Sequence, residues 1–313
     1  MNRNFDVRKI VLWLFGIMIV SFLIAGSIMS VKGVGSVFVK SAGKTGNQDI
    51  NIEKEFNAAD IKDMSISTSS TNINVIPVDT NAVKVHYHGY FRGMAGKTAP
   101  ELEVGLNGSR LVVREKHKVN ISIGFNFTNQ ELKLDLYVPK SYAGSLELGT
   151  SSGDVNVDGL SFDRFNFSSS SGNLHAASLN TKNAELNTSS GDFTVKGFSG
   201  GLRFNSSSGK LDASDVDLTG NMSVNTSSGD INVDFSKLAG NINSNTSSGE
   251  VKLRLPENAE FDVQFDTSSG DFETNFPLTQ NIKNRHEVRA KAGNGGSNIT
   301  AHSSSGDLQI FKR

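Results

Sequence analysis

Residues 226–233 read Thr-Ser-Ser-Gly-Asp-Ile-Asn-Val, and close relatives of this octapeptide recur through the second half of the chain. Its core, Ser-Ser-Gly, occurs eight times at intervals of 18 to 21 residues, apart from one last interval of 36. The glycines of these tripeptides are Gly153, Gly172, Gly191, Gly209, Gly229, Gly249, Gly270 and Gly306. A period near 20 residues is typical of stacked units that are too small to bury a core alone.

The residues around each glycine indicate what kind of unit repeats. Seven residues before the glycine and two residues after it, the position is apolar in all eight copies, and three before it the residue is always Ser or Thr. Positions seven, five, three and one before the glycine share a parity, so on a strand they face the same side. This alternation excludes a helical repeat. We therefore expect one strand, a turn at the glycine, and a second strand.

These units predict an all-β fold, a parallel β-helix (a solenoid) with coils of about 20 residues, over residues 146–313. The usual handedness of parallel crossovers favours a right-handed helix, and a stack of independent antiparallel hairpins is the alternative. The glycine supplies either a positive φ or room for close approach of two backbones. The inward Ser and Thr hydroxyls are expected to bond the backbone groups at the corner.

The interval of 36 residues between Gly270 and Gly306 breaks the pattern. It contains either two coils, one of which has lost its motif, or one coil with an insertion. The apolar columns are absent when the register is counted back from Gly306, which favours an insertion over residues 277–296. We expect this polar, basic segment to form a protruding hairpin or loop.

Residues 50–145 are also rich in strand patterns but lack the motif. Met64 to Ile76 resembles a degenerate first coil, and Asn107-Gly108 between two alternating runs predicts a β-hairpin. A solenoid needs a cap over the open edge of its first coil. We expect this region to be the N-terminal end of the solenoid together with an antiparallel cap.

The N-terminus carries an uncharged apolar run from Ile10 to Val31. As a helix it would span about 33 Å, enough to cross the hydrocarbon core. Positive charges precede it, which predicts a cytoplasmic stub at residues 1–9 and an extracytoplasmic remainder. Residues 32–49, rich in Gly and Lys, then form a flexible stalk. The alternative is a signal peptide cleaved near Ala25-Gly26-Ser27.

Composition excludes several classes of function. The net charge of −1 does not favour nucleic acid as a partner. The absence of Cys excludes disulfides, thiolate metal sites and Cys nucleophiles. No clustered set of acids and bases and no nucleophile motif is present, so we expect neither an enzyme nor a cofactor.

Three sets of polar residues are candidate sites. The residue after each glycine is mostly Asp or Glu, which indicates a row of cation sites, a charged stripe facing a polymer, or the chemistry of the turn, and we favour the turn. Asn recurs four residues before the glycine, where stacked amides stabilise a β-helix. His86 and His88 would share one face of a strand and could hold a metal, but no third ligand is evident, so exposed histidines without a metal are favoured.

The repeated Thr-Ser-Ser-Gly-Asp motif and the closing residues 304–310, Ser-Ser-Gly-Asp-Leu-Gln-Ile, resemble bacterial adhesin-like domains of unknown function. The anchor followed by the repeat resembles LiaG-like membrane proteins, encoded in cell-envelope stress operons of Gram-positive bacteria. The resemblance implies a β-helix over about residues 50–313, and it implies no site residues because its motif is the structural turn.

Together these features predict a membrane-anchored binding or scaffold module of the cell envelope. Its partner would be cell-wall polymer or an envelope membrane protein, in an envelope-stress setting. A regulatory partner of a membrane signalling protein is the alternative. A β-helix enzyme acting on glycans is disfavoured.

Overall fold

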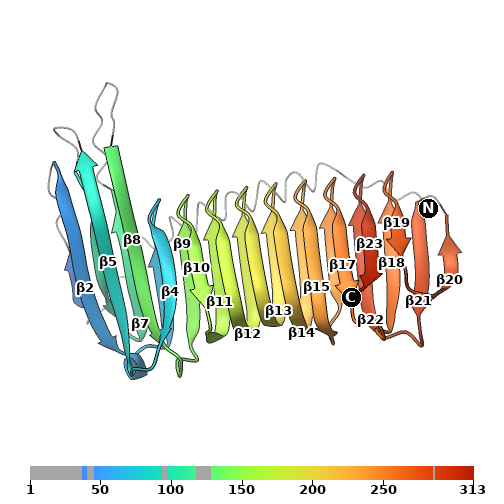
Figure 1. Cartoon of the computed structure of the whole chain (residues 1–313), viewed down its shortest axis with the longest axis horizontal. Helices are drawn as coiled ribbons and strands as arrows, with labels where there is room; N and C mark the ends of the chain where they lie inside the picture. The colour runs from blue at the N-terminus through green and yellow to red at the C-terminus, as the bar shows by residue number, and fades with distance from the viewer. Residues whose placement is uncertain (1–36, 41–45, 94–97, 118–127, 285) are drawn as a thin grey trace. The chain divides into compact units, whose positions relative to one another are not determined.

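The computed structural model describes residues 37–40, 46–93, 98–117, 128–284 and 286–313, shown in Figure 1. Within them it contains 23 β-strands and one short 3-10 helix, Ala58–Asp60. No helix in the described part of the chain has the length and apolar character needed to cross a membrane. The predicted stub (1–9) and transmembrane segment (Ile10 to Val31) lie outside the described residues.

The strands fall into three groups along the chain. The N-terminal strands are β1 (Val37–Lys40), β2 (Gln48–Asn57), β3 (Asp63–Ser67), β4 (Asn72–Val78), β5 (Ala82–Gly93), β6 (Glu101–Asn107), β7 (Arg110–Lys116) and β8 (Thr128–Pro139). The strands of the regular repeat are β9 (Ser145–Thr150), β10 (Val155–Asp158), β11 (Ser161–Ser169), β12 (Leu174–Thr188), β13 (Phe193–Ser206), β14 (Leu211–Thr226), β15 (Ile231–Leu238), β16 (Ile242–Thr246) and β17 (Val251–Leu255). The C-terminal strands are β18 (Phe261–Thr267), β19 (Phe272–Thr274), β20 (Leu278–Lys283), β21 (Glu287–Ala292), β22 (Ser297–Ser303) and β23 (Leu308–Lys312).

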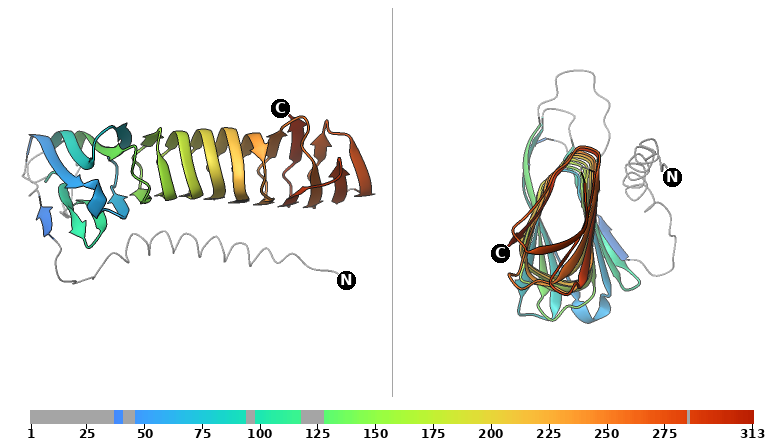
Figure 2. Two further views of the ribbon diagram at one scale, coloured as in Figure 1. Left: turned by 90° about the horizontal axis from the view of Figure 1, so that it is seen from below. Right: turned by 90° about the vertical axis from the view of Figure 1, so that its right-hand side faces the viewer.

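The predicted parallel solenoid is confirmed. Equivalent strands of successive coils pair in parallel and in register, so that Leu186 lies opposite Phe204, and Phe204 opposite Val224. The end view in Figure 2 shows the coils superimposed around one closed cross-section. We name each coil by its glycine. The stack of independent hairpins is wrong for these coils, because their pairing is parallel.

Apolar side chains fill the interior in columns. Leu186, Phe204 and Val224 are each no more than 1% exposed, and the intervening residues of the same strands face outward. Each buried residue therefore packs between the equivalent residues of the coils on either side. This is how a unit that cannot bury its own apolar face becomes stable in a stack.

The glycine corner is explained by close approach of backbones. A Cβ on Gly191 would overlap the carbonyl oxygen of Gly172, and the same contact repeats from coil to coil. None of the eight repeat glycines has a positive φ. The backbone N–H of the glycine donates to the hydroxyl three residues earlier, at 2.6–3.0 Å, in seven of the eight coils. The exception is the Gly249 coil, where Thr246 donates to Ser303 instead.

The middle coils also contain a corner that the repeat pattern did not predict. Six residues after the repeat glycine, Gly159, Ser178, Gly197 and Asp215 all have φ between 51° and 69°. The chain turns there into a third short stretch, which contributes buried residues such as Phe198 to the core. The cross-section therefore has three sides in these coils, rather than the two predicted.

The C-terminal end departs from sequence order. β22 and β23, which form the Gly306 coil, lie between the Gly249 coil and the Gly270 coil and pair in parallel with both. Residues 277–296, predicted to protrude as a hairpin or loop, do form an antiparallel hairpin of β20 and β21, but this hairpin is part of the sheet and does not protrude. β21 pairs antiparallel with β18, so the segment caps the outermost coil. It then leads the chain back to the position between the Gly249 coil and the Gly270 coil.

The N-terminal end is interleaved in a similar way. β3 and β4 form the predicted degenerate coil, with Thr71 in place of the glycine. β7 and β8 form another coil outside it, so the coil of β3 and β4 is not the first of the stack, as predicted, but the second. Antiparallel strands extend both sides of that coil, β5 and β2 beyond β8, and β6 and β1 beyond β7. The Asn107-Gly108 hairpin is confirmed as the β6–β7 turn, with Gly108 at φ 59°. β1 and the first two residues of β2 lie inside residues 32–49, the segment predicted to be a flexible stalk.

Candidate functional site

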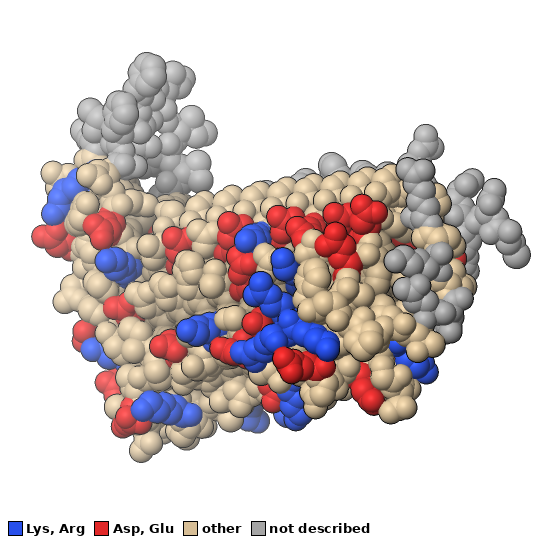
Figure 3. All heavy atoms as spheres, turned by 45° about the vertical axis from the view of Figure 1, so that its right-hand side comes forward, with Lys and Arg blue, Asp and Glu red and all other residues tan. Residues whose placement is uncertain are grey.

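A groove of about 430 Å³ lies on the outer surface of the solenoid, across the first parts of β13 and β14 and across β15 and β17. Its lining residues are Thr194, Asp212, Ala213, Ser214, Asn232, Val233, Asp234, Lys252 and Arg254. Figure 3 shows Lys and Arg side chains gathered among acidic ones on one face of the middle and C-terminal coils.

The repeat itself positions these side chains. Thr194, Asp212, Asn232 and Lys252 each stand three residues after a repeat glycine, and they pair in register across neighbouring strands. The residues on either side of each are buried, so this position faces outward. Adjacent members of the row are consequently about 4.8 Å apart, the spacing between paired strands.

The acidic groups of the groove are held by neighbours. Asn232 donates to Asp212 Oδ1 at 2.9 Å, and Lys210 Nζ lies 2.9 Å from Asp212 Oδ2. The hydrogen bond with Asp212 raises the pKa of the Lys210 amine above its usual value. Asp234 lies 3.1 Å from Arg313 Nε, at the end of the chain. These contacts fix both carboxylates in the groove.

The basic groups of the groove are less constrained. Lys252 Nζ lies 5.7 Å from the centroid of the Phe311 ring, a cation–π contact. Within the described residues, no carboxylate forms an ion pair with Lys252 or Arg254. The two cations, two residues apart on β17, are thus available to an anionic ligand. The remaining polar side chains of the groove, which carry hydroxyl, amide and carboxylate groups, can bond the hydroxyls of that ligand.

The residues after the repeat glycines have a structural use. Asp154 Oδ1 accepts the backbone N–H of Asn173, Asn173 Oδ1 accepts that of Asp192, and Asp192 Oδ1 accepts that of Lys210, at 2.9–3.0 Å. The Lys210 side chain has no acceptor. Within the described residues, it therefore makes no equivalent hydrogen bond with the backbone N–H of Asp230 in the Gly229 coil. The interpretation of this row as turn chemistry is therefore supported by its hydrogen bonds.

The predicted asparagine ladder is confirmed. The amide of Asn205 donates to Asn187, that of Asn225 to Asn205, and that of Asn245 to Asn225, at 2.8–3.1 Å. The register places His302 next in the row, 3.3 Å from Asp266. These amides bond mainly to one another and serve the stack.

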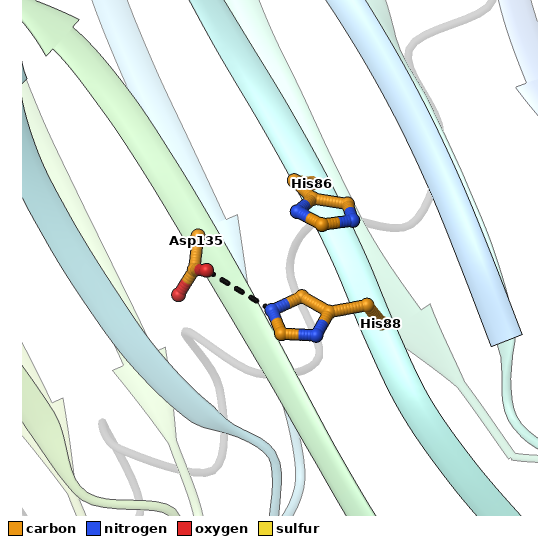
Figure 4. A group of neighbouring side chains, drawn as sticks. All are labelled: His86, His88 and Asp135. Atoms are coloured by element: carbon orange, nitrogen blue, oxygen red, sulfur yellow. Dashed lines mark hydrogen bonds and ion pairs between the residues drawn. The ribbon is translucent and has the colours of Figure 1, made fainter.

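Asp135 on β8 joins the two histidines that the sequence singled out. His86 and His88 lie on the outer face of β5, and Figure 4 shows Asp135 beside them. Candidate ligand atoms of the three residues all lie within 4.8 Å of one another. Sequence reasoning missed Asp135 because it is far along the chain, although the alternation of residues 132–138 predicts that it faces outward.

The remaining histidines are spread over the molecule. His117 Nε2 lies 3.2 Å from the buried carboxylate of Glu115. His175 extends the outward row of the groove toward the N-terminal end, opposite Thr194. His286 lies in the turn between β20 and β21, where its backbone N–H donates to Asn284.

Comparison with known proteins agrees with the architecture. A model of the Toastrack DUF4097 family matches residues 61–311, which is most of the chain and runs from just before β3 into β23. The chain belongs to this family. No curated protein matches this family member.

Three solved structures are similar to the Toastrack chain. One is a "putative adhesin" from Bacteroides fragilis, with 12% identity, a TM-score of 0.49, and coverage of 84% of this chain and 97% of that one. Another is a "putative adhesin" from Parabacteroides distasonis, with 10% identity, a TM-score of 0.40 and the same coverage. The third is a "putative cell adhesion protein" from Clostridium sporogenes, with 11% identity, a TM-score of 0.28, and coverage of 85% and 100%.

Proposed function

We propose that this Toastrack chain is a binding module of the bacterial cell envelope, anchored in the cytoplasmic membrane by residues 10–31, and that its groove binds cell-wall polymer. The observation that carries the proposal is the pair Lys252 and Arg254, free of ion pairs within the described part of the chain, beside the polar row of the groove. The resemblance to LiaG-like proteins supports an envelope-stress setting for this module.

An extended polymer fits this surface better than a compact molecule does. Thr194, Asp212, Asn232 and Lys252 present polar groups at a regular spacing of about 4.8 Å along the solenoid. A chain of sugars with anionic substituents could bond the carboxylates and amide through hydroxyls, and the two cations through its anions. Compact ligands are usually held in enclosed, mostly apolar pockets, whereas this groove is open and seven of its nine lining residues are polar or charged.

The test is co-sedimentation of the purified full chain, in detergent, with isolated cell-wall sacculi over a series of salt concentrations. We expect saturable binding that weakens as salt rises, because salt screens contacts between exposed charges. The double variant Lys252→Gln/Arg254→Gln should bind about tenfold more weakly, which corresponds to a loss of about 1.4 kcal/mol.

The matched control is Arg164→Gln/Arg203→Gln, which removes the same charge from exposed positions on the first strands of the coils. This control should bind as tightly as the wild-type chain. Equal weakening by both double variants would show that net charge, rather than the groove, carries the binding. Absence of binding at every salt concentration would overturn the proposal in favour of a protein partner in the membrane.

A further inference from the structure

We propose that His86, His88 and Asp135 form a binding site for a divalent first-row transition-metal ion, such as zinc. The two histidines are two residues apart on β5, so their rings project from the same face, and Asp135 projects from the adjacent antiparallel strand β8. The imidazole rings stack with their centroids 4.2 Å apart and an interplanar angle of 19°. This site is separate from the groove and does not depend on the proposed function.

The spacing of the His88 and Asp135 atoms suits a shared ion. His88 Nε2 lies 3.0 Å from Asp135 Oδ2. Two ligand atoms bound to one zinc ion at 2.0–2.2 Å in a tetrahedral arrangement lie about 3.4 Å apart. An ion can therefore take the place of the proton between these two atoms with a shift of a few tenths of an ångström.

His86 is oriented by a partner outside the cluster. Its Nε2 lies 2.7 Å from Asn51 Oδ1 on β2. An amide oxygen only accepts, so Nε2 carries the hydrogen and Nδ1 carries the lone pair that a metal needs. Metal-binding histidines commonly donate their other N–H to a carbonyl or carboxylate in this way.

The carboxylate is held in place as well. Asn74 on β4 donates to Asp135 Oδ1 at 2.7 Å, and Asn156 donates to Asn74 at 3.0 Å. This leaves Asp135 Oδ2 directed at His88 (Figure 4). Four strands thus fix the three candidate ligands: β5 and β8 carry them, and β2 and β4 orient them. A histidine pair that served only solubility would need no such supports.

The donor set indicates the class of ion. Two imidazoles and one carboxylate suit zinc and its first-row neighbours, whereas calcium and magnesium prefer oxygen ligands alone. Three protein ligands leave at least one position for water or another ligand. Glu53 lies 3.7 Å from His86 Nε2, but Lys84 engages its carboxylate at 3.0 Å, so Glu53 would not coordinate the ion.

The experiment is calorimetric titration of the purified full chain with zinc chloride, after removal of metals with a chelator. We expect one equivalent of zinc to bind, and magnesium chloride not to compete. His88→Asn and Asp135→Asn should each weaken zinc binding at least tenfold. The control His175→Asn changes another outward-facing histidine, on β12, and should leave zinc binding unchanged. Zinc binding that survives both ligand variants, or no binding by the wild-type chain, would overturn the proposal.

A second measurement needs no variant. X-ray absorption fine structure at the zinc K edge of the zinc-loaded wild-type chain should show two imidazole nitrogens bound to the ion together with oxygen ligands. Bound zinc should also raise the midpoint of thermal unfolding, since it binds the folded chain in preference to the unfolded one. A first shell made of oxygen alone would overturn the assignment even if zinc binds.

Discussion

Gly306 stacks on Gly249, and Gly270 stacks on Gly306, although Gly270 comes earlier in the chain. Along the chain, the outermost coil therefore comes first, its cap of β20 and β21 comes next, and the last residues form the coil between the Gly249 coil and the Gly270 coil. β22 pairs with β16 on one side and β18 on the other, and β23 pairs with β17 and β19. The C-terminal segment is consequently an interior coil.

This order predicts the pattern of amide exchange near the C-terminus. Terminal segments commonly fray, but the amides of β22 and β23 are paired on both sides and should exchange as slowly as those of β16 and β17. β20 pairs only with β21 within the described residues, and its amides should exchange fastest in this region. Hydrogen–deuterium exchange with peptide-level mass spectrometry measures both. Rapid exchange in β22 and β23 would contradict the interleaved order.

Gly191→Ala should be strongly destabilising. The new Cβ would overlap the carbonyl oxygen of Gly172, and the two coils cannot separate without breaking their shared ladder. We expect the free energy of unfolding to fall by about 3 kcal/mol, the upper part of the range for overpacking. Urea unfolding of the purified chain measures it.

Gly149→Ala is the matched control for that substitution. Gly149 also lies on a strand of the repeat region, but its Cβ would meet only Ile66 O, at 3.9 Å, an ordinary contact. Its effect on the free energy of unfolding should stay below about 1 kcal/mol. Equal losses from both alanine substitutions would show that the close approach at the repeat corner is unimportant.

Most of the solenoid was predictable because its information is local and repeated. Apolar columns, inward hydroxyls and the glycine corner all follow from eight aligned copies. The corner at Ser178 and Asp215 was missed because the position six residues after the repeat glycine holds Gly, Ser or Asp in different coils, and its positive φ is not evident from such a mixed column. The order of the last coils was missed because the repeat period gives only the spacing of coils along the chain. Which coils pair in space depends on which strand edges are unpaired.

The candidate sites were predictable only in part. His86 and His88 stand out because they lie two apart on one strand, but Asp135 and Asn51 come from distant strands whose register the sequence does not show. The groove was not predicted. Its row follows from the repeat, but Lys252 within the row and Arg254 two residues later look like ordinary variation until their neighbours are known.

Phe204→Asp tests the register of the core. Phe204 is fully buried and packs between Leu186 and Val224, so an aspartate there would place an unpaired carboxylate among apolar side chains. We expect a loss of several kcal/mol in the free energy of unfolding. Arg203→Asp, at the adjacent exposed position, should change it by less than about 0.5 kcal/mol. Thermal unfolding of the two variants compares them, and similar midpoints would mean that the assigned register is wrong.

His117 should make the stability of the N-terminal end depend on pH. Its hydrogen bond with the carboxylate of Glu115 raises its pKa above the usual value. Tyr87 and the backbone of Ser69 also donate to this carboxylate, which stays in place when His117 is changed. The folded chain therefore holds the His117 proton more tightly than the unfolded chain does.

The sign of the effect follows from that shift. The stabilisation is fully present below the unfolded pKa of about 6.5, and it is lost as pH rises through the higher folded value. His117→Asn should therefore lower the free energy of unfolding at pH 5.5 and have little effect at pH 8.5. The side chain is 39% exposed, so solvent screening limits the difference to less than about 1 kcal/mol. Urea unfolding at the two pH values measures it, with His175→Asn as the control. A larger loss at pH 8.5 than at pH 5.5 would show that His117 acts through packing rather than through its charge.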